Sequence, residues 1–194
     1  MNDIIRWNDQ YYIRASSSLA DGRTEVLKQG ETFAVFDRYG DIHHALSGPQ
    51  GLYHEGTRFL SRFELSLQAQ RPMLLSATVK EDNALFTGDL TNPDLVLDGQ
   101  RSIPRGTLHV CRTRFLWQGT CHERIRVHNY GTMKVPLSLT FILETDFANL
   151  FEARGQQRPR RGSRLKTVRS KAGLVFGYKG LDGAIRRTSV RCSP

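Results

Sequence analysis

The longest run of alternating apolar and polar residues lies between Val135 and Phe147. One parity of this run is apolar, and its members are Val135, Leu137, Leu139, Phe141, Leu143 and Phe147. Side chains alternate across a β-strand, so the pattern predicts one long strand with an apolar face against a core. Ile142 breaks the alternation, which indicates that part of the outer face is covered too. After Asp146 the alternation gives way to a short charged segment and an arginine-rich loop.

Shorter alternating stretches, separated by turn residues, follow one another from Thr24 onward. Residues 32–46 predict a hairpin that turns at Tyr39-Gly40, and residues 57–68 predict a strand. On one face of that strand we place Phe59, Phe63, Leu65 and Leu67. Further strands are predicted over residues 73–79, 84–90, 163–168, 173–178 and 184–190.

The clearest hairpin spans residues 107–129, with Gln118-Gly119 as a two-residue turn. The register set by this turn gives the pairs Trp117–Thr120, Leu116–Cys121, Cys111–Arg126 and His109–His128. Cys111 and Cys121 therefore do not meet. On the second strand, Cys121, Ile125 and Val127 face one way, and the basic residues alternate with them.

Together these patterns predict an all-β protein with little helix, built as a large antiparallel β-sandwich. The only helical expectation is a single turn within residues 147–153. Residues 1–24 are expected to be a lead-in segment with little core, and residues 25–194 the sandwich domain. The strand pattern ends only just before Pro194, so we expect the chain to be part of a longer protein.

The net charge of +9 is unevenly distributed. From Arg154 to Pro194 there are 12 Lys and Arg residues and one acid, Asp182, which leaves 16 basic against 18 acidic residues before them. The three cysteines are too few for a disulfide framework. The sequence has no signal-peptide pattern and no apolar run long enough to span a bilayer, so a cytoplasmic protein without membrane contact is expected.

Six segments, taken in order, resemble one protein family: LKQGETFAVFDRYGDI, GLYHEGTRFLSRFELSL, LLSATVKEDNALFTGDLTNPDL, IPRGTLHV, ERIRVHNYG and DFANLFEARGQQRPRRG. Over residues 26–190 the chain is similar to the N-terminal domain of bacterial glycogen-debranching, amylo-α-1,6-glucosidase-like proteins. The resemblance implies a supersandwich-like β-domain, followed in the parent glycoside hydrolase by a catalytic (α/α)-toroid. Nothing in this chain resembles the toroid, so we expect a non-catalytic domain whose partners are the toroid and an α-glucan.

The sequence offers weak signals for chemistry of its own. Glu144 and Asp146 share a strand face, and the separation of their carboxyl groups would be compatible with the acid pair of a glycoside hydrolase. However, such pairs are usual on solvated strands, and neighbouring arginines can balance their charge. The metal candidates are His109 with Cys111, Cys121 with His122, and His43 with His44; none has the spacing of a known metal motif. We therefore expect no metal, no cofactor and no catalytic residue.

The resemblance makes the loop after Gly48-Pro49-Gln50-Gly51 a candidate contact with glucan or toroid. The candidate binding residues, there and beyond Asp146, are Tyr53, His54, Glu55, Arg58, Asp146, Glu152 and Arg154. An aromatic ring with Arg and carboxylate partners suits a sugar. The structural alternative is that Tyr53 covers a core edge while Arg58 pairs with Asp146 or Glu152.

Two other functions stay open at this point. One is a stand-alone carbohydrate-binding sandwich. The other is binding of an anion or nucleic acid by a basic cluster, Arg154, Arg158, Arg160, Arg161 and Arg164. Nucleic acid is the less favoured ligand because Phe151 is the only aromatic residue near this cluster. Self-association of the chain through surface meant for the toroid is also expected.

Overall fold

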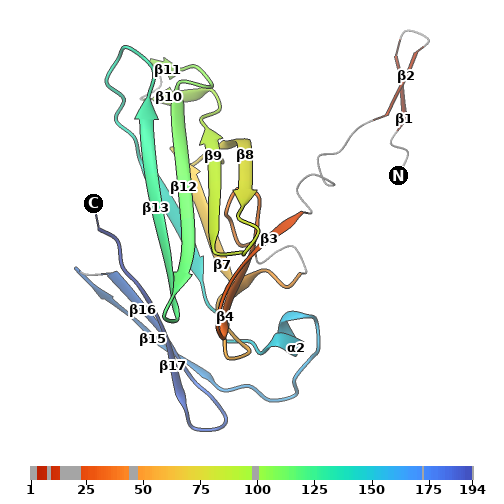
Figure 1. Cartoon of the computed structure of the whole chain (residues 1–194), viewed down its shortest axis with the longest axis vertical. Coiled ribbons are helices and arrows are strands. Elements are labelled where there is room, and N and C mark those ends of the chain that lie inside the picture. The colour runs from red at the N-terminus through yellow and green to blue at the C-terminus, as the bar shows by residue number, and fades with distance from the viewer. Residues whose placement is uncertain are drawn as a thin grey trace.

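The computed structural model describes residues 4–7, 10–13, 23–43, 48–97, 101–171 and 173–193 of the chain (Figure 1). Antiparallel β-strands make up almost all of its regular structure, which confirms the predicted all-β fold. Within these ranges one short helix occurs, α2 (Leu150–Ala153), where the sequence predicted a single turn. No helix of the described ranges is long and apolar enough to cross a membrane.

Two four-stranded sheets form most of the body. The first runs in the order β3 (Thr24–Gln29), β4 (Thr32–Asp37), β5 (Gly51–His54) and β6 (Thr57–Leu60). The second runs in the order β13 (Thr120–Asn129), β12 (Leu108–Trp117), β9 (Leu85–Thr91) and β8 (Met73–Val79). Behind the second sheet in Figure 1 lies β7 (Arg62–Leu67), paired with β14 (Leu139–Glu144).

Three smaller sheets complete the description. They are β1 (Ile4–Trp7) with β2 (Gln10–Ile13), β10 (Leu95–Leu97) with β11 (Arg101–Ile103), and β15 (Ser163–Ser170) with β16 (Gly173–Lys179) and β17 (Ile185–Val190). The last three strands match those predicted from the sequence. Apart from β1 and β2, most of the predicted lead-in segment lies outside the described residues.

The core is formed where the sheets face one another. Its central cluster joins the two four-stranded sheets and contains Leu27, Ala34, Phe36, Ile42, Leu60, Phe86 and Leu116. A second cluster joins β7 to β9 and β12, and a third lies under β10 and β11. The rings of Phe36 and Phe86 meet edge to face, with centroids 4.9 Å apart. Burial of these apolar faces is the main stabilising contribution to a sandwich.

The strand predicted over residues 135–147 is shorter than expected, because β14 covers only Leu139–Glu144. Pro136 has no N–H for a ladder, and the residues before Leu139 take no strand conformation. Val135 and Leu137 nevertheless pack against buried clusters, as predicted. The alternation therefore identified the buried side of the segment correctly but overestimated the length of the strand.

Two other predictions need correction. The chain does turn at Tyr39-Gly40, but Ile42 does not return to β4; it forms a bridge with Phe63 of β7. The Asp37 side chain accepts hydrogen bonds from the backbone N–H groups of Tyr39 and Asp41, and this tight turn leads the chain to another strand. Residues 57–68 form two strands divided at Ser61, so Phe59 does not share the face of Phe63.

The β12–β13 hairpin agrees with the prediction in every pair that was named. Trp117 lies opposite Thr120, His109 opposite His128 and Cys111 opposite Arg126. Three cysteines are free in the described residues: Cys111, Cys121 and Cys192. The turn residues Gln118 and Gly119 both have positive φ, 47° and 71°. This geometry is that of the two-residue turn whose twist suits an antiparallel hairpin.

Candidate functional site

The β5–β6 hairpin carries the first four predicted site residues. Glu55 and Gly56 form its two-residue turn with φ of 45° and 72°. Gly51, the first residue of β5, allows a close approach of the backbone to Arg58, because a Cβ there would lie 2.4 Å from Cδ of Arg58. The hairpin thus presents Glu55 at an exposed tip and turns Arg58 inward.

Arg58 connects this hairpin to the residues that follow β14. Its Nε donates to Asp146 Oδ1 at 3.1 Å and its Nη2 donates to Oδ2 at 2.5 Å, while Nη1 donates to the Gln50 carbonyl at 3.0 Å. Both side chains of the pair are about nine-tenths buried, with exposures of 10% and 8%. Two-point pairing of a guanidinium with a carboxylate is strong and directional. The backbone N–H of Arg58 also donates to the Ala148 carbonyl, which holds β6 against the segment after β14.

Tyr53 lies beside this ion pair but is completely buried. Its ring stacks on Phe33 with centroids 4.6 Å apart, and its hydroxyl donates to the Pro49 carbonyl at 2.9 Å. Burial raises the pKa of the Tyr53 hydroxyl. The ring therefore covers the core edge, as the structural alternative had it. His54 points elsewhere, with Nδ1 2.8 Å from the Thr32 hydroxyl.

Helix α2 positions the remaining predicted residues. Asn149 caps its start by accepting from the Glu152 N–H at 2.8 Å, and the Glu152 carboxylate accepts in return from the Asn149 N–H at 3.0 Å. Glu152 also pairs with Arg161 at 3.1 Å and with Arg158 at 3.4 Å. Arg154 follows the helix and is exposed. Two of the five predicted basic residues of the loop are thus held by one carboxylate.

The structure therefore brings Arg58, Asp146, Glu152 and Arg154 to one end of the sandwich, and α2 marks that end in Figure 1. Tyr53 lies in the interior beneath them and interacts electrostatically with Arg58, Asp146 and Arg154. Glu144 is not part of this group. It is an exposed residue paired with Arg62 at 2.9 Å, so the two carboxylates considered for hydrolysis are held by different arginines.

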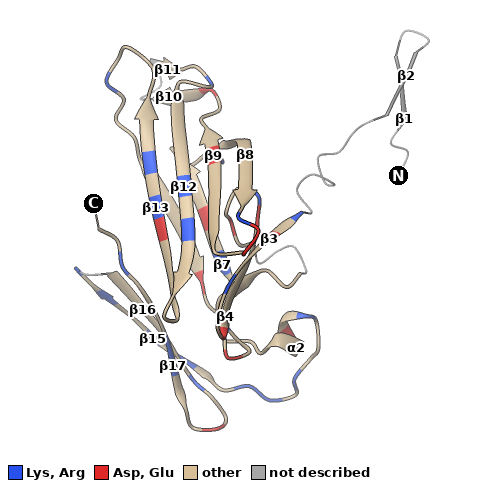
Figure 2. Cartoon of the chain, viewed as in Figure 1, with Lys and Arg blue, Asp and Glu red and all other residues tan. Residues whose placement is uncertain are grey.

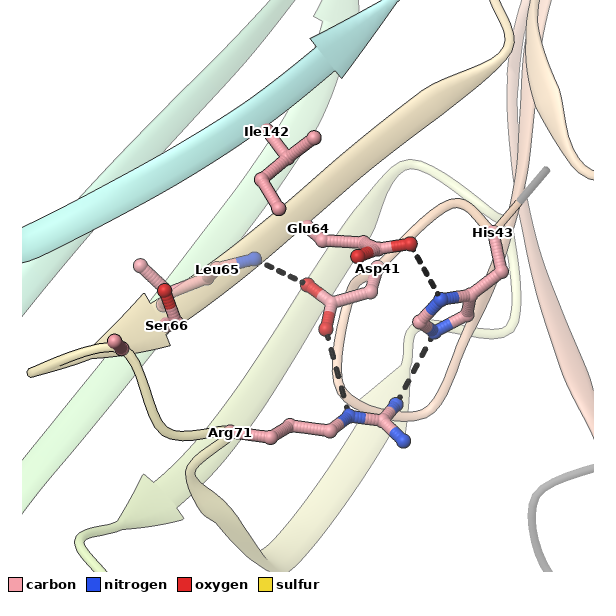
Figure 3. Close-up of a pocket in the computed structure, with 8 residues that line it drawn as sticks. Asp41, His43, Glu64, Leu65, Ser66, Arg71 and Ile142 are labelled. Atoms are coloured by element: carbon pink, nitrogen blue, oxygen red, sulfur yellow. Dashed lines mark hydrogen bonds and ion pairs between the residues drawn. The ribbon is translucent and has the colours of Figure 1, made fainter. Parts of the chain in front are cut away.

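A second site, missed in the sequence, lies around His43 (Figure 3). A cavity of about 230 Å³ is lined by Asp41, His43, Glu64, Leu65, Ser66, Ala69, Arg71 and Ile142. His43 Nδ1 lies 3.0 Å from Glu64 Oε1, and its Nε2 lies 2.9 Å from Asp37 Oδ2. Arg71 donates to the same Asp37 oxygen and lies over the Tyr39 ring, 3.8 Å from its centroid.

Electrostatics at this second site favour the charged form of His43. The hydrogen bond with Asp37 raises the pKa of the His43 imidazole, with partial burial opposing it. Burial alone would raise the pKa of Glu64, but the bonds from Arg62 and His43 outweigh burial and lower it. Two ionised acceptors, one on each side of the ring, are satisfied together only by an imidazolium.

Beneath the cavity lies a series of buried ion pairs, which the sequence analysis also did not predict. Arg112, fully buried, pairs with Asp41 at 2.5 Å and with Glu123 at 2.7 Å; Arg114 shares Glu123 at 2.5 Å. Burial raises the pKa of Glu123, but Arg114 and Arg112 outweigh burial and lower it. The signal was available, because these three charged residues have the core-facing parity of the paired strands β12 and β13.

The metal candidates named from the sequence do not assemble. His109 pairs with Asp89 at 3.0 Å, His122 stacks on Phe115, and Cys111 lies apart from Cys121. His44 lies outside the described residues. Within the described ranges, Asp37, Asp41 and His43 have donor atoms close enough for a metal, all within 4.8 Å of one another. The Arg71 guanidinium already supplies a cation there, so this group carries no metal assignment.

Comparison with known families matches residues 27–194 to the model described as the N-terminal domain of (some) glycogen debranching enzymes. Neither the curated proteins nor the solved structures give a significant match. The family match covers both sites described above and all the strands from β4 onward. This chain therefore belongs to the family of N-terminal domains of glycogen debranching enzymes.

Proposed function

We propose that this chain is a non-catalytic domain of a glycogen-debranching glycoside hydrolase, which packs on the catalytic toroid and helps to shape the cleft for the α-glucan. The contacts would come from the end of the sandwich that carries Arg58, Asp146, Glu152 and Arg154. Its exposed parts are Glu55 at the tip of the β5–β6 hairpin, helix α2, and Arg154, which follows α2. The catalytic carboxylic acids would then belong to the toroid.

The observation that carries this proposal is the buried Arg58–Asp146 pair. It joins residues 88 positions apart and holds the exposed hairpin tip beside α2. A surface fixed in this way loses little conformational freedom on association, which favours docking. Phe151 adds exposed apolar area at the same place, since the residue is 64% accessible. Such an exposed aromatic next to charged groups is typical of an interface.

Anion or nucleic-acid binding by the basic cluster has less support. Arg158 and Arg161 are engaged by Glu152, and Arg161 also donates to the Asp146 carbonyl at 2.7 Å. A ligand would therefore have to replace contacts that already hold the loop in place.

Oxidative footprinting tests the proposed packing. The chain is compared alone and joined to its toroid domain, with the reactivity of two exposed rings as the readout. Phe151, 64% accessible, should lose most of its reactivity on joining, because it lies in the proposed contact. Tyr130, 70% accessible, directly follows β13, whose C-terminal end lies far from α2 in Figure 1; it is the matched control and should stay reactive. Unchanged reactivity of Phe151 would refute the proposal.

A further inference from the structure

We propose that the cavity beside His43 binds one neutral, polyhydroxylated six-membered ring, such as the pyranose ring of a sugar. The inference rests on the proposed function in one respect: a pyranose is the repeating unit of an α-glucan. The site is separate from α2 and the hairpin tip, and the residues that build it come from the turn after β4, from β7, from the β7–β8 loop and from β14.

The first argument comes from polar groups that face the cavity with bonding capacity to spare. Asp41 is 1% exposed, and its Oδ1 accepts from Leu65 N–H and from Arg112. Among the described residues no donor makes a hydrogen bond to its Oδ2, and Arg71 Nε lies 3.8 Å from it, beyond a hydrogen bond. The Ser66 hydroxyl has no hydrogen-bond partner within those ranges. Ring hydroxyls can donate to the first group and exchange bonds with the second.

The second argument is the charge balance of the lining. Glu64 and Asp41 are the acidic residues of the lining, and Arg71 and His43 are the basic ones. Each already has a partner of opposite charge: Glu64 pairs with Arg62, Asp41 with Arg112, and both basic residues with Asp37. Figure 3 shows these groups converging below Ile142. A charged ligand would add an uncompensated charge to a partly buried site, which is costly. A neutral ligand avoids this cost, and its hydroxyls can both donate and accept.

The third argument is shape. Ile142 is 41% exposed, and the β7–β14 register sets it opposite Glu64 on the outer face, with Thr140 opposite Ser66. Together with Ala69 it gives the cavity an apolar wall suited to the C–H face of a sugar ring. The break that Ile142 makes in the alternation of β14 thereby gains an explanation. A volume of about 230 Å³ is below the roughly 300–1,000 Å³ of drug-sized pockets, so one ring is the appropriate size.

The rim of the cavity is formed in advance. Gln68 and Ala69 are consecutive non-glycine residues with positive φ, 48° and 61°. This conformation is uncommon for such residues and persists where surrounding contacts specify it. Those contacts are present, since Gln68 donates from its N–H to the Ser138 carbonyl at 3.0 Å and from Nε2 to the Pro136 carbonyl at 2.8 Å.

The experiment is a titration of the whole chain with D-glucose, followed by NMR through the methyl signals of isoleucine. Glucose should shift the Ile142 signal in a saturable manner, with a dissociation constant on the order of 1 mM, as expected for a ligand of so few atoms. Ser66→Ala, followed at Ile142, should weaken binding about fivefold or more. Ile142→Ser removes the reporter methyl, so its binding is followed at the methyl of Ala69, which also lines the cavity, and it should weaken by a similar factor. Ile185→Ser, at another exposed strand isoleucine (51% accessible), is the control and should bind as the unchanged chain does.

Glycerol separates ring recognition from general hydroxyl effects, because it offers hydroxyls without a ring face. Saturable shifts with glucose but not with glycerol support the inference. No shift of Ile142, or equal linear shifts with both compounds, would overturn it. Loss of this binding would leave the footprinting result at Phe151 unaffected, so failure here and failure of the proposed domain packing can be told apart.

Discussion

Glu123 is the carboxylate that two buried arginines share in the interior of this sandwich. It accepts from Arg112 at 2.7 Å and from Arg114 at 2.5 Å, and both arginines are almost completely buried. Both guanidinium groups also donate to the Gly40 carbonyl, which ties β12 to the turn after β4. Removing the shared carboxylate would leave two buried positive charges with one carboxylate, Asp41, between them.

Glu123→Gln should therefore lower the free energy of unfolding by about 3–5 kcal/mol, the usual effect of breaking a buried ion pair. Urea denaturation of the two proteins measures the difference. Glu144→Gln is the matched control: Glu144 is exposed and pairs with Arg62, so its loss should cost at most about 1 kcal/mol. Equal effects of the two substitutions would show that burial does not strengthen the dependence on Glu123.

At the scale of single residues, the sequence predicted some of the long-range ion pairs and missed others. Arg58–Asp146 was among the expected pairings because both residues stood in recognisable motifs. The Asp41–Arg112 pair spans 71 positions, and no local pattern specifies which distant acid a buried arginine will meet. What the pattern could have shown is that Arg112, Arg114 and Glu123 have the core-facing parity, which requires them to find partners.

Among the elements, the turn after β4 connects two sheets and carries the residue that joins them. It sends the chain from one sheet to β7, and His43 bridges the two by contacting Asp37 of β4 and Glu64 of β7. Arg71, from the β7–β8 loop, is the other charged group that faces the ring. The strength of the connection between these elements thus depends on the protonation of one imidazole.

The contribution of His43 to stability should depend on pH with a definite sign. Its pKa is raised in the folded state, so the contribution is complete below the unfolded value of about 6.5 and is lost as pH rises through the folded value. The difference in unfolding free energy between the unchanged chain and His43→Gln should be largest near pH 6 and shrink at higher pH. His122→Gln, at the exposed ring stacked on Phe115, should show a small difference throughout. If the difference in unfolding free energy between the unchanged chain and His43→Gln grew with rising pH, His43 would not be charged in the folded protein.

Elements were predicted well where the signal is local. The β12–β13 register follows from a two-residue turn, and the helical turn at α2 follows from its capping residues. The length of β14 and the partner of Ile42 were wrong, because a proline and a side-chain-stabilised turn override alternation in ways that depend on the rest of the fold.

At the scale of the whole molecule, the sheet β15–β16–β17 has both exposed apolar residues and many positive charges. Its register sets Leu165, Val168, Val175 and Ile185 on one face, three of them exposed by 39%, 59% and 51%. Figure 2 shows Lys and Arg recurring along the same strands and the loop before them, with acid only at the β16–β17 turn. Apolar surface favours contact with another copy, while like charge opposes it.

Salt should therefore increase self-association of the chain, because it screens the repulsion and leaves apolar contact in place. Sedimentation velocity at low and high salt measures the change in mass. Val168→Glu combined with Ile185→Glu should abolish the increase, while Leu75→Glu, at an exposed residue of β8 (60%), should retain it. Association that weakens as salt rises would contradict this account.

The pairing of β7 with β14 has a consequence for how the chain folds. Leu65 of β7 lies opposite Phe141, and the hydroxyl of Thr188 bonds to the carbonyl of Phe59, 129 positions away. Hairpins such as β12–β13 can close early, whereas these distant contacts must wait for loop closure, which slows folding. During synthesis β7 leaves the ribosome well before β14 does, so its edge stays open meanwhile. A chaperone that covers open strand edges would accordingly be needed most in the interval between residues 67 and 144.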